Sequence, residues 1–195
     1  MNLFLLLKLF VLCLGSFLSG LAINWSLTIF PDIVKDNLQI MKASLVSNYA
    51  SYYQTTYVIG NIVGTVYWPI LEKKINKRNC LVLGLLLQGL ILYAQGFVLN
   101  IHYICFTRFL AGSFENIYVI GKAYLFEICD SKKYRIIGFS LKSILLMMGI
   151  FVGPWIGNFV YMANNKNFSL TCKILSNFYW IDIGLFVVTF YLLSS

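Results

Sequence analysis

Four long stretches without a charged residue constrain this chain more than any other feature of its sequence. They cover residues 9–31, 43–71, 79–107 and 143–165, and none contains Asp, Glu, Lys or Arg. A helix of about 20 apolar residues crosses the hydrocarbon core of a bilayer, and each stretch is longer than that. A membrane β-barrel would show alternating apolar and polar positions, whereas these stretches are continuously apolar. We therefore predict an all-α, polytopic membrane protein.

Two further stretches, 106–127 and 177–194, are apolar apart from a few charged residues. Counting both as spans gives six transmembrane helices in a single domain over residues 1–195. The first span could instead be a cleaved signal peptide, but no positive charge precedes its apolar run. We therefore favour a transmembrane helix that is not cleaved off. The six expected spans cover approximately residues 3–30, 47–71, 80–99, 103–127, 136–161 and 177–194.

Composition narrows the classes of function. Hydrophobic residues make up 59% of the chain and charged residues 11%, whereas soluble domains have roughly 25% charged residues. The net charge of +8 comes from short basic clusters between apolar stretches, which favours membrane loops over a nucleic-acid surface. His102 is the single histidine, the five cysteines form no C-x-x-C pair, and G-x-S-x-G and H-E-x-x-H are missing. We expect the chain to lie in a lipid bilayer and to bind no nucleic acid, metal or cofactor. We do not expect it to be an enzyme.

Basic residues are distributed unequally between the two sides of the expected topology. The loops at 72–78 and 130–135 share one side and together contain seven Lys or Arg. The loops of the opposite side contain four, which are Lys35, Lys42, Lys166 and Lys173. Because basic loops stay in the cytoplasm, both termini are expected to be cytoplasmic. The membrane itself, plasma membrane or endomembrane including the vacuolar one, is left open.

An N-glycosylation sequon, Asn167-Phe168-Ser169, falls in a loop of the opposite side. Such sequons are used on the lumenal or extracellular side, so the sequon agrees with the charge distribution. A chance match is the alternative. We take Asn167 as a candidate glycosylation site.

Three charged residues of the fourth expected span follow one another at intervals of seven. Arg108, Glu115 and Lys122 would therefore project from roughly one face of a continuous helix. A charge at mid-bilayer costs at least about 2.5–3.5 kcal/mol, so three on one helix indicate a polar cavity or a partner. The alternative is that Glu115 only neutralises a basic neighbour while the two cations reach the interfaces.

The fifth expected span carries small residues at helical spacing around a proline. Gly149, Gly153, Pro154 and Gly157 form the pattern G-x-x-x-G-P-x-x-G. Glycines at this spacing let a neighbouring helix approach closely, and the proline removes a backbone hydrogen bond. We expect a bend with tight packing.

These motifs resemble those of one membrane-protein family. Residues 149–157 are similar to the antiporter motif of the drug:proton antiporters in the major facilitator superfamily, and Thr107–Phe114 resembles the fourth-helix R-x-x-x-G motif of the same family. The zinc-induced facilitator-like branch is the most similar. The resemblance implies a role in proton coupling for Arg108, and a role in conformational change for Gly149, Gly153, Pro154 and Gly157.

A third motif resembles the family in part. The segment Trp68–Gly84 aligns with the family's loop W-G-x-x-x-D-R-x-G-R-K, in which Lys73 replaces the acidic residue. The basic character is kept by Lys74, Lys77 and Arg78. In the family the acidic residue helps to hold the two halves of the transporter together, so Lys73 in its place is not expected to make that contact.

Members of the family have twelve helices in two halves, and this chain corresponds to the first half. The resemblance therefore implies transmembrane transport of a small solute, coupled to protons and completed by a second copy or another six-helix partner. A non-transporting or degenerate subunit derived from such a transporter is the alternative. The substrate is not identified by the sequence.

The charge distribution predicts the orientation. A sequon engineered into residues 72–79 should stay unmodified when the chain is inserted into microsomes, because this loop is expected to be cytoplasmic, whereas Asn167 should be glycosylated. Endoglycosidase-sensitive gel shifts measure both sites. The opposite pattern would show that the chain is inserted the other way round.

Overall fold

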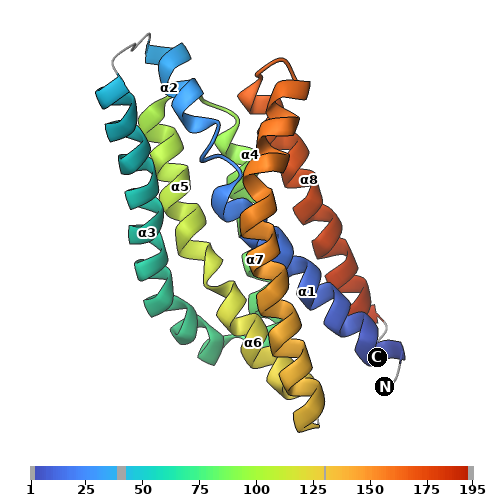
Figure 1. The fold of residues 1–195 in the computed structure, drawn as a ribbon. Helices are drawn as coiled ribbons and strands as arrows, with labels where there is room; N and C mark the ends of the chain where they lie inside the picture. Colours follow the sequence, from blue (N-terminus) through green and yellow to red (C-terminus); the bar gives the residue numbers. More distant parts are fainter. Residues whose placement is uncertain (1–2, 39–42, 130, 193–195) are drawn as a thin grey trace.

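The computed structural model describes residues 3–38, 43–129 and 131–192, and the described part contains helices and no strand. The all-α prediction is therefore confirmed. Figure 1 shows the helices packed side by side as an elongated bundle. The elements are α1 (Leu3–Asn24), α2 (Phe30–Leu38), α3 (Ala43–Lys74), α4 (Lys77–Gln95), α5 (Ile101–Glu115), α6 (Ile117–Ile128), α7 (Lys132–Ala163), α8 (Phe168–Val187) and the π-helical turn η1 (Val188–Leu192).

Four described helices are long and apolar enough to cross a membrane, namely α1, α4, α7 and α8 with its continuation into η1. Helix α3 has the length, at 32 residues, but many Tyr, Thr, Ser and Asn residues lower its hydropathy. The fourth expected span is divided at Asn116 into α5, with 15 residues, and α6, with 12. The count of six spans stays a prediction.

Two helix boundaries differ from the expected ones. The first helix ends at Asn24 and not near residue 30, and a turn leads into α2. The last begins at Phe168 and not at 177, because the Asn167 side chain caps it by accepting a hydrogen bond from the Leu170 N–H at 3.0 Å. Lys42, residue 130 and residues 193–194, which entered the predicted loops and last span, lie outside the described residues.

The helices pair in an order that differs from their order in the chain. The most extensive contacts join α1 to α7, α3 to α5 and α4 to α8. In Figure 1 the start of α1 and the end of α8 lie at one end of the bundle, together with the connections from α3 to α4 and from α6 to α7. Helix α2 and the turn between α7 and α8 lie at the opposite end.

Glycines bring α7 against α1. A Cβ on Gly149 would collide with the backbone carbonyl of Phe17, and one on Gly157 with that of Trp25. From the other helix, a Cβ on Gly20 would collide with the carbonyl of Leu146. Helix α7 presents its small residues to α1, as glycines at this spacing predict.

Helices α3 and α5 meet in the same way. A Cβ on Gly60 would collide with the carbonyl of Phe109, one on Gly64 with that of Ser113, and one on Gly112 with that of Tyr57. The α1–α7 and α3–α5 pairs therefore both pack closely because glycines, which have no side chain, lie at their contact.

Pro154 lies inside α7, which continues through it as a helix from Lys132 to Ala163. A proline has no N–H, so the carbonyl of Ile150, four residues earlier, loses its partner in the helix. The Asn24 side chain at the end of α1 donates to this carbonyl, with Nδ2 and O 3.5 Å apart. The proline is accommodated by a contact between helices.

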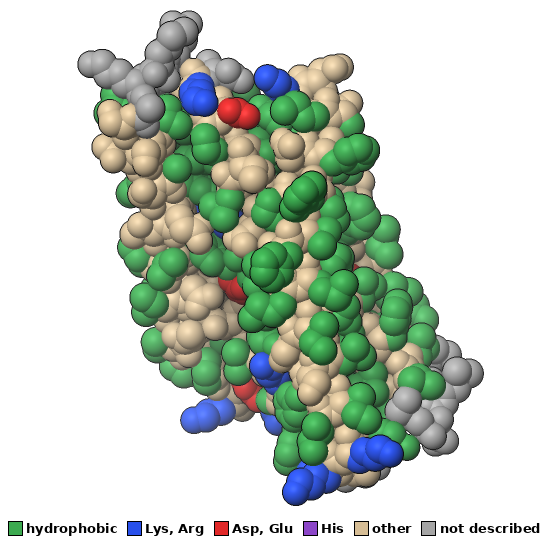
Figure 2. Space-filling model, in the orientation of Figure 1, with side chains coloured by type: hydrophobic (Ala, Val, Ile, Leu, Met, Phe, Trp, Pro, Cys, Tyr) green, Lys and Arg blue, Asp and Glu red, His purple; other side chains and the backbone are tan. Residues whose placement is uncertain are grey.

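Hydrophobic side chains are spread along the whole length of the molecular face in Figure 2, and Lys and Arg gather mostly towards its two ends. On α7 the apolar exposure is extreme, since Phe151, Trp155 and Phe159 are 74–80% exposed. Such a surface would aggregate in water but is suited to lipid or to another membrane helix. The charge-poor middle and basic ends are those of a membrane protein.

The glycine contacts predict a selective loss of stability. Gly149→Ala should destabilise the fold by about 1–3 kcal/mol, because its Cβ would push α7 away from the backbone of α1. Gly184→Ala is the control, since no atom lies within 4 Å of its added Cβ and alanine favours the helix by roughly 0.5–1 kcal/mol. Thermal unfolding in detergent micelles measures both, and equal melting temperatures would contradict the close packing.

Candidate functional site

Arg108 of α5 is buried, with 1% of its surface exposed. Its guanidinium forms hydrogen bonds with carbonyls at the end of α1. The last carbonyls of a helix have no partner within it and carry partial negative charge. Because α1 ends at Asn24, the carbonyls of Ala22 and Ile23 are available. Arg108 donates to both, from Nη1 to the Ala22 oxygen at 3.0 Å and from Nη2 to the Ile23 oxygen. The guanidinium is thus paired with backbone, and no ion pair within the described residues involves it.

Two tyrosines of α3 complete the surroundings of this guanidinium. The ring centroids of Tyr57 and Tyr53 lie 4.4 and 4.9 Å from its central carbon, which are cation–π distances. The Tyr53 hydroxyl accepts a hydrogen bond from Gln95 of α4 at 3.3 Å. The Nε of Arg108 is buried and has no partner among the described residues.

A small cavity lies beside Arg108, and Glu115 also lines it. About 20 Å³ is open to the centre of a water-sized sphere, which is room for about one water molecule. Glu115 is half-buried, and its Oε2 accepts a hydrogen bond from Asn61 at 3.4 Å. The structure therefore brings two of the three predicted charges to one cavity, which is too small for a solute. The other polar residues that line it are Ser19, Tyr57, Gln88, Gln95 and Tyr179.

The third predicted residue, Lys122, does not line this cavity, and it does not belong to the same helix as Arg108 and Glu115, contrary to the continuous helix assumed from the sequence. The helix breaks at Asn116, whose side-chain amide donates to the carbonyl of Asn61 at 2.8 Å. Trp68 stabilises the break by donating from Nε1 to the carbonyl of Ser113 at 2.9 Å. Because α6 starts a new helix, the spacing of seven no longer fixes the direction of Lys122. Its ammonium lies 4.6 Å from the ring of Tyr118.

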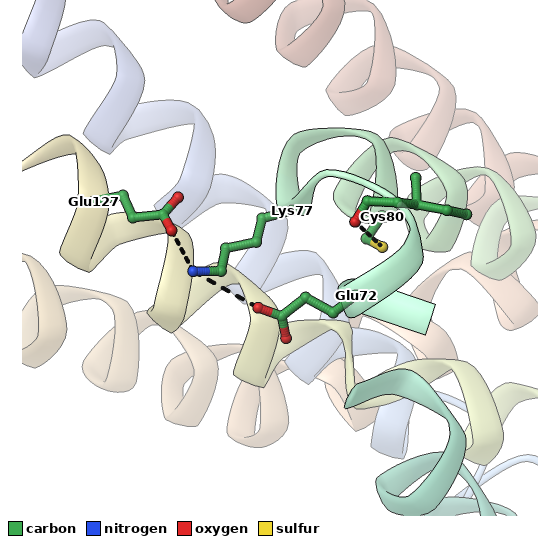
Figure 3. A network of polar contacts seen from close by, with 5 residues as sticks. Glu72, Lys77, Cys80 and Glu127 are labelled. Atoms are coloured by element: carbon green, nitrogen blue, oxygen red, sulfur yellow. Dashed lines mark hydrogen bonds and ion pairs between the residues drawn. The ribbon is translucent and has the colours of Figure 1, made fainter. Parts of the chain in front are cut away.

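The basic loop joins three helices at the end of the bundle. Lys77 at the start of α4 forms ion pairs with Glu72 of α3, at 3.8 Å, and with Glu127 of α6, as Figure 3 shows. Arg78 donates to the carbonyl of Phe190 at 2.7 Å. Lys74 is exposed at the end of α3. Ion pairs at the protein surface contribute about 0.2–1 kcal/mol each, so these partly exposed pairs set the geometry of the loop more than the stability of the fold.

The candidate glycosylation residue, Asn167, is exposed in the turn before α8. Its Oδ1 caps the helix, and its Nδ2, the atom that accepts a glycan, makes no described hydrogen bond. Within residues 3–38, 43–129 and 131–192, no group of three or more His, Cys, Asp or Glu is placed to hold a metal ion.

Neutral polar residues around Arg108 were not identified from the sequence. Tyr53, Tyr57 and Gln95 lie in apolar stretches, where tyrosine and glutamine are common enough to give no distinct pattern. The available signal was the polarity of the stretch 43–71, which contains many hydroxyl and amide side chains for a span. Lys142 and Asp182 are charged residues within apolar segments, and no sequence pattern connects them.

An apolar helical bundle that encloses a buried arginine and a water-sized polar cavity is typical of an integral membrane protein. The sequence model of the Major Facilitator Superfamily matches residues 12–194, and the chain belongs to that family. It is similar to "Protein ZINC INDUCED FACILITATOR 1" of Arabidopsis thaliana, with 26% identity over 118 residues. The match covers 60% of this chain and 24% of that relative. The chain therefore corresponds to a minor part of the relative's length, and its fold resembles one half of a major facilitator.

The contacts of Arg108 predict how substitutions affect stability. Arg108→Leu leaves two helix-end carbonyls unpaired inside the bundle and should cost about 1.5–3 kcal/mol for each charged hydrogen bond lost. Arg108→Lys should cost less, because an ammonium keeps the charge. Arg135→Leu is the matched control, since Arg135 also donates to a carbonyl and lies over an aromatic ring, but outside the cavity. Equal losses of thermal stability for both leucine variants would contradict a special role for Arg108.

Proposed function

We propose that the chain forms one six-helix half of a transporter that moves a small solute across a membrane in exchange for protons. Membership of the Major Facilitator Superfamily supports transport in general. Proton coupling is supported by the resemblance of the segment around Arg108 to the fourth-helix R-x-x-x-G motif of the drug:proton antiporters, and by the cavity that Arg108 shares with Glu115.

The observation that carries the proposal is this shared cavity. Charged groups inside a membrane protein are costly and are rarely kept without a use. Arg108 is bound by backbone carbonyls, so Glu115 is not required to neutralise it. Glu115 is free to gain or lose a proton next to a permanent positive charge. Its protonation would change the net charge of the cavity, and a ligand or conformation sensitive to that charge would be coupled to the proton.

The solute itself needs a larger site. The cavity has room for about one water molecule, so we infer that the solute site forms when a second six-helix unit packs on this one. A second copy of the chain or another six-helix protein would supply it, with all termini in the cytoplasm. The resemblance assigns a role in conformational change to Gly149, Gly153, Pro154 and Gly157, and the three glycines lie against the backbone of residues 17–25.

The alternative, a non-transporting subunit, was suggested by the replacement of the family's acidic loop residue by Lys73. Glu72, one position earlier, forms an ion pair with Lys77 in the same loop. Lys77 also binds Glu127, so the loop keeps an acid–base network between α3, α4 and α6. This network favours a working transporter over a degenerate one.

Proton exchange in liposomes tests the proposal. The full chain would be reconstituted into vesicles that contain a pH-sensitive dye, with ethidium or Zn²⁺, the ion in the relative's name, as probe solutes. We expect solute-driven proton movement that Glu115→Gln abolishes and Arg108→Lys slows about tenfold, equivalent to ~1.4 kcal/mol of barrier. Asp32→Asn and Arg135→Lys should behave as wild type, because neither residue lines the cavity.

Two outcomes would contradict the proposal. Proton movement equal to that of empty vesicles with both probes would favour the non-transporting subunit. Full coupling in the Glu115→Gln variant would show that the proton is carried elsewhere.

A further inference from the structure

Two further ionisable residues, Lys142 and Asp182, lie inside the bundle and line a cavity other than that of Arg108. Asp182 of α8 is 1% exposed, and neither of its carboxylate oxygens has a hydrogen-bond partner among the described residues. Lys142 of α7 is 3% exposed. Both line one cavity, with about 20 Å³ open to the centre of a water-sized sphere, and they form no direct ion pair in the described structure. A buried carboxylate without partners is costly, so the cavity demands an occupant or a proton.

We propose that Lys142, Asp182 and one bridging water molecule form a second ionisable site, in which Asp182 binds a proton that is exchanged with the Glu115 cavity. The volume fits one water molecule, which could donate to the carboxylate and accept from the ammonium. The ammonium of Lys142 would repel a metal cation. When a proton arrives, it adds to a carboxylate oxygen and leaves a neutral acid facing the lysine, and the reverse step returns it to water.

The groups around the site come from five helices. Helix α4 contributes the apolar side chains of Leu81 and Leu85 to the cavity wall. The titratable or charged groups that face Lys142 or Asp182 are Tyr118 and Lys122 of α6, Cys13 of α1 and Tyr179 of α8. Tyr118 has both lysines at its ring, with the Lys142 ammonium 5.0 Å and the Lys122 ammonium 4.6 Å from the centroid.

Ser19 of α1 connects the two cavities, because it lines both. Its hydroxyl donates to the carbonyl of Gly15 at 2.9 Å, which leaves its oxygen able to accept. Ser16, one turn earlier, lines the Asp182 cavity in the same way and donates to Leu12. A proton could therefore pass between Glu115 and Asp182 in two linked transfers. The water of one cavity gives a proton to the Ser19 oxygen, and the Ser19 hydroxyl, on turning away from the Gly15 carbonyl, gives its own proton to the water of the other cavity.

Infrared spectroscopy of the full chain in nanodiscs tests the site. Difference spectra between acid and alkaline buffer should contain a carboxylic-acid band that Asp182→Asn removes and Asp182→Glu displaces. Asp32→Asn, which changes an exposed aspartate of α2, should leave that band in place. In Lys142→Met the band should persist to higher pH, because the lost ammonium no longer favours the carboxylate form.

The folding of each variant is checked by helicity and by a single size-exclusion peak. If Asp182→Asn does not fold, the displacement in Asp182→Glu and the change in Lys142→Met decide the question. A folded Asp182→Asn with an unchanged carboxylic-acid region, or Asp182→Glu and Lys142→Met spectra identical to wild type, would overturn the proposal.

The connection through Ser19 is tested by the rate of protonation after a rapid drop in pH. Ser19→Ala should slow the appearance of the Asp182 band severalfold without changing its final size. Ser176→Ala is the matched control, since Ser176 is also buried and bonded to its own helix but lines neither cavity. An unchanged rate in Ser19→Ala would overturn the connection. These spectra need no solute, so a normal band without exchange in liposomes would contradict only the proposed transport.

Discussion

The hydrogen bonds between Arg108 and the end of α1 are the interaction on which the interior of this protein depends. They require α1 to stop at Asn24, inside the bundle, where its last carbonyls are open to side chains. The chain then turns into α2, which lies against α3. Tyr53 and Tyr57 of α3 face the same guanidinium, so one cation joins three helices. In lipid such a charge is tolerated because protein surrounds it on all sides.

The glycine contacts provide the framework around that cation. Gly60, Gly64 and Gly112 hold α3 against α5, which fixes the tyrosines relative to Arg108. Gly149 and Gly157 hold α7 against α1, which fixes the helix end that accepts its hydrogen bonds. Membrane helices gain little from burying apolar surface against each other, so close backbone contact is the main source of their packing energy. The packing of the bundle and the surroundings of Arg108 therefore depend on the same two helix pairs.

Much of this arrangement could be predicted from the sequence, because uncharged stretches and glycine spacing are local features. The all-α class followed from the uncharged stretches, and the family from the resemblance of residues 107–114 and 149–157 to known motifs. The break at Asn116 could not be predicted, since the stretch around it reads as one continuous helix and the break is stabilised by Asn61 and Trp68 from α3. The early start of α8 was missed because its cap, Asn167, was seen only as a sequon. The cavity that Lys142 and Asp182 both line depends on how α7 and α8 pack, which single-residue patterns do not contain.

Because the partners of Arg108 are backbone carbonyls, its hydrogen bonds tolerate changes of sequence and changes of pH. A carboxylate partner could be lost through a single substitution, whereas the peptide oxygens of Ala22 and Ile23 remain whatever side chains stand at those positions. Peptide oxygens also do not titrate, so the counter-charge of the arginine is the same in acid and in alkali. Sequence changes in α1 can therefore alter the shape of the cavity while the arginine keeps its hydrogen-bond partners.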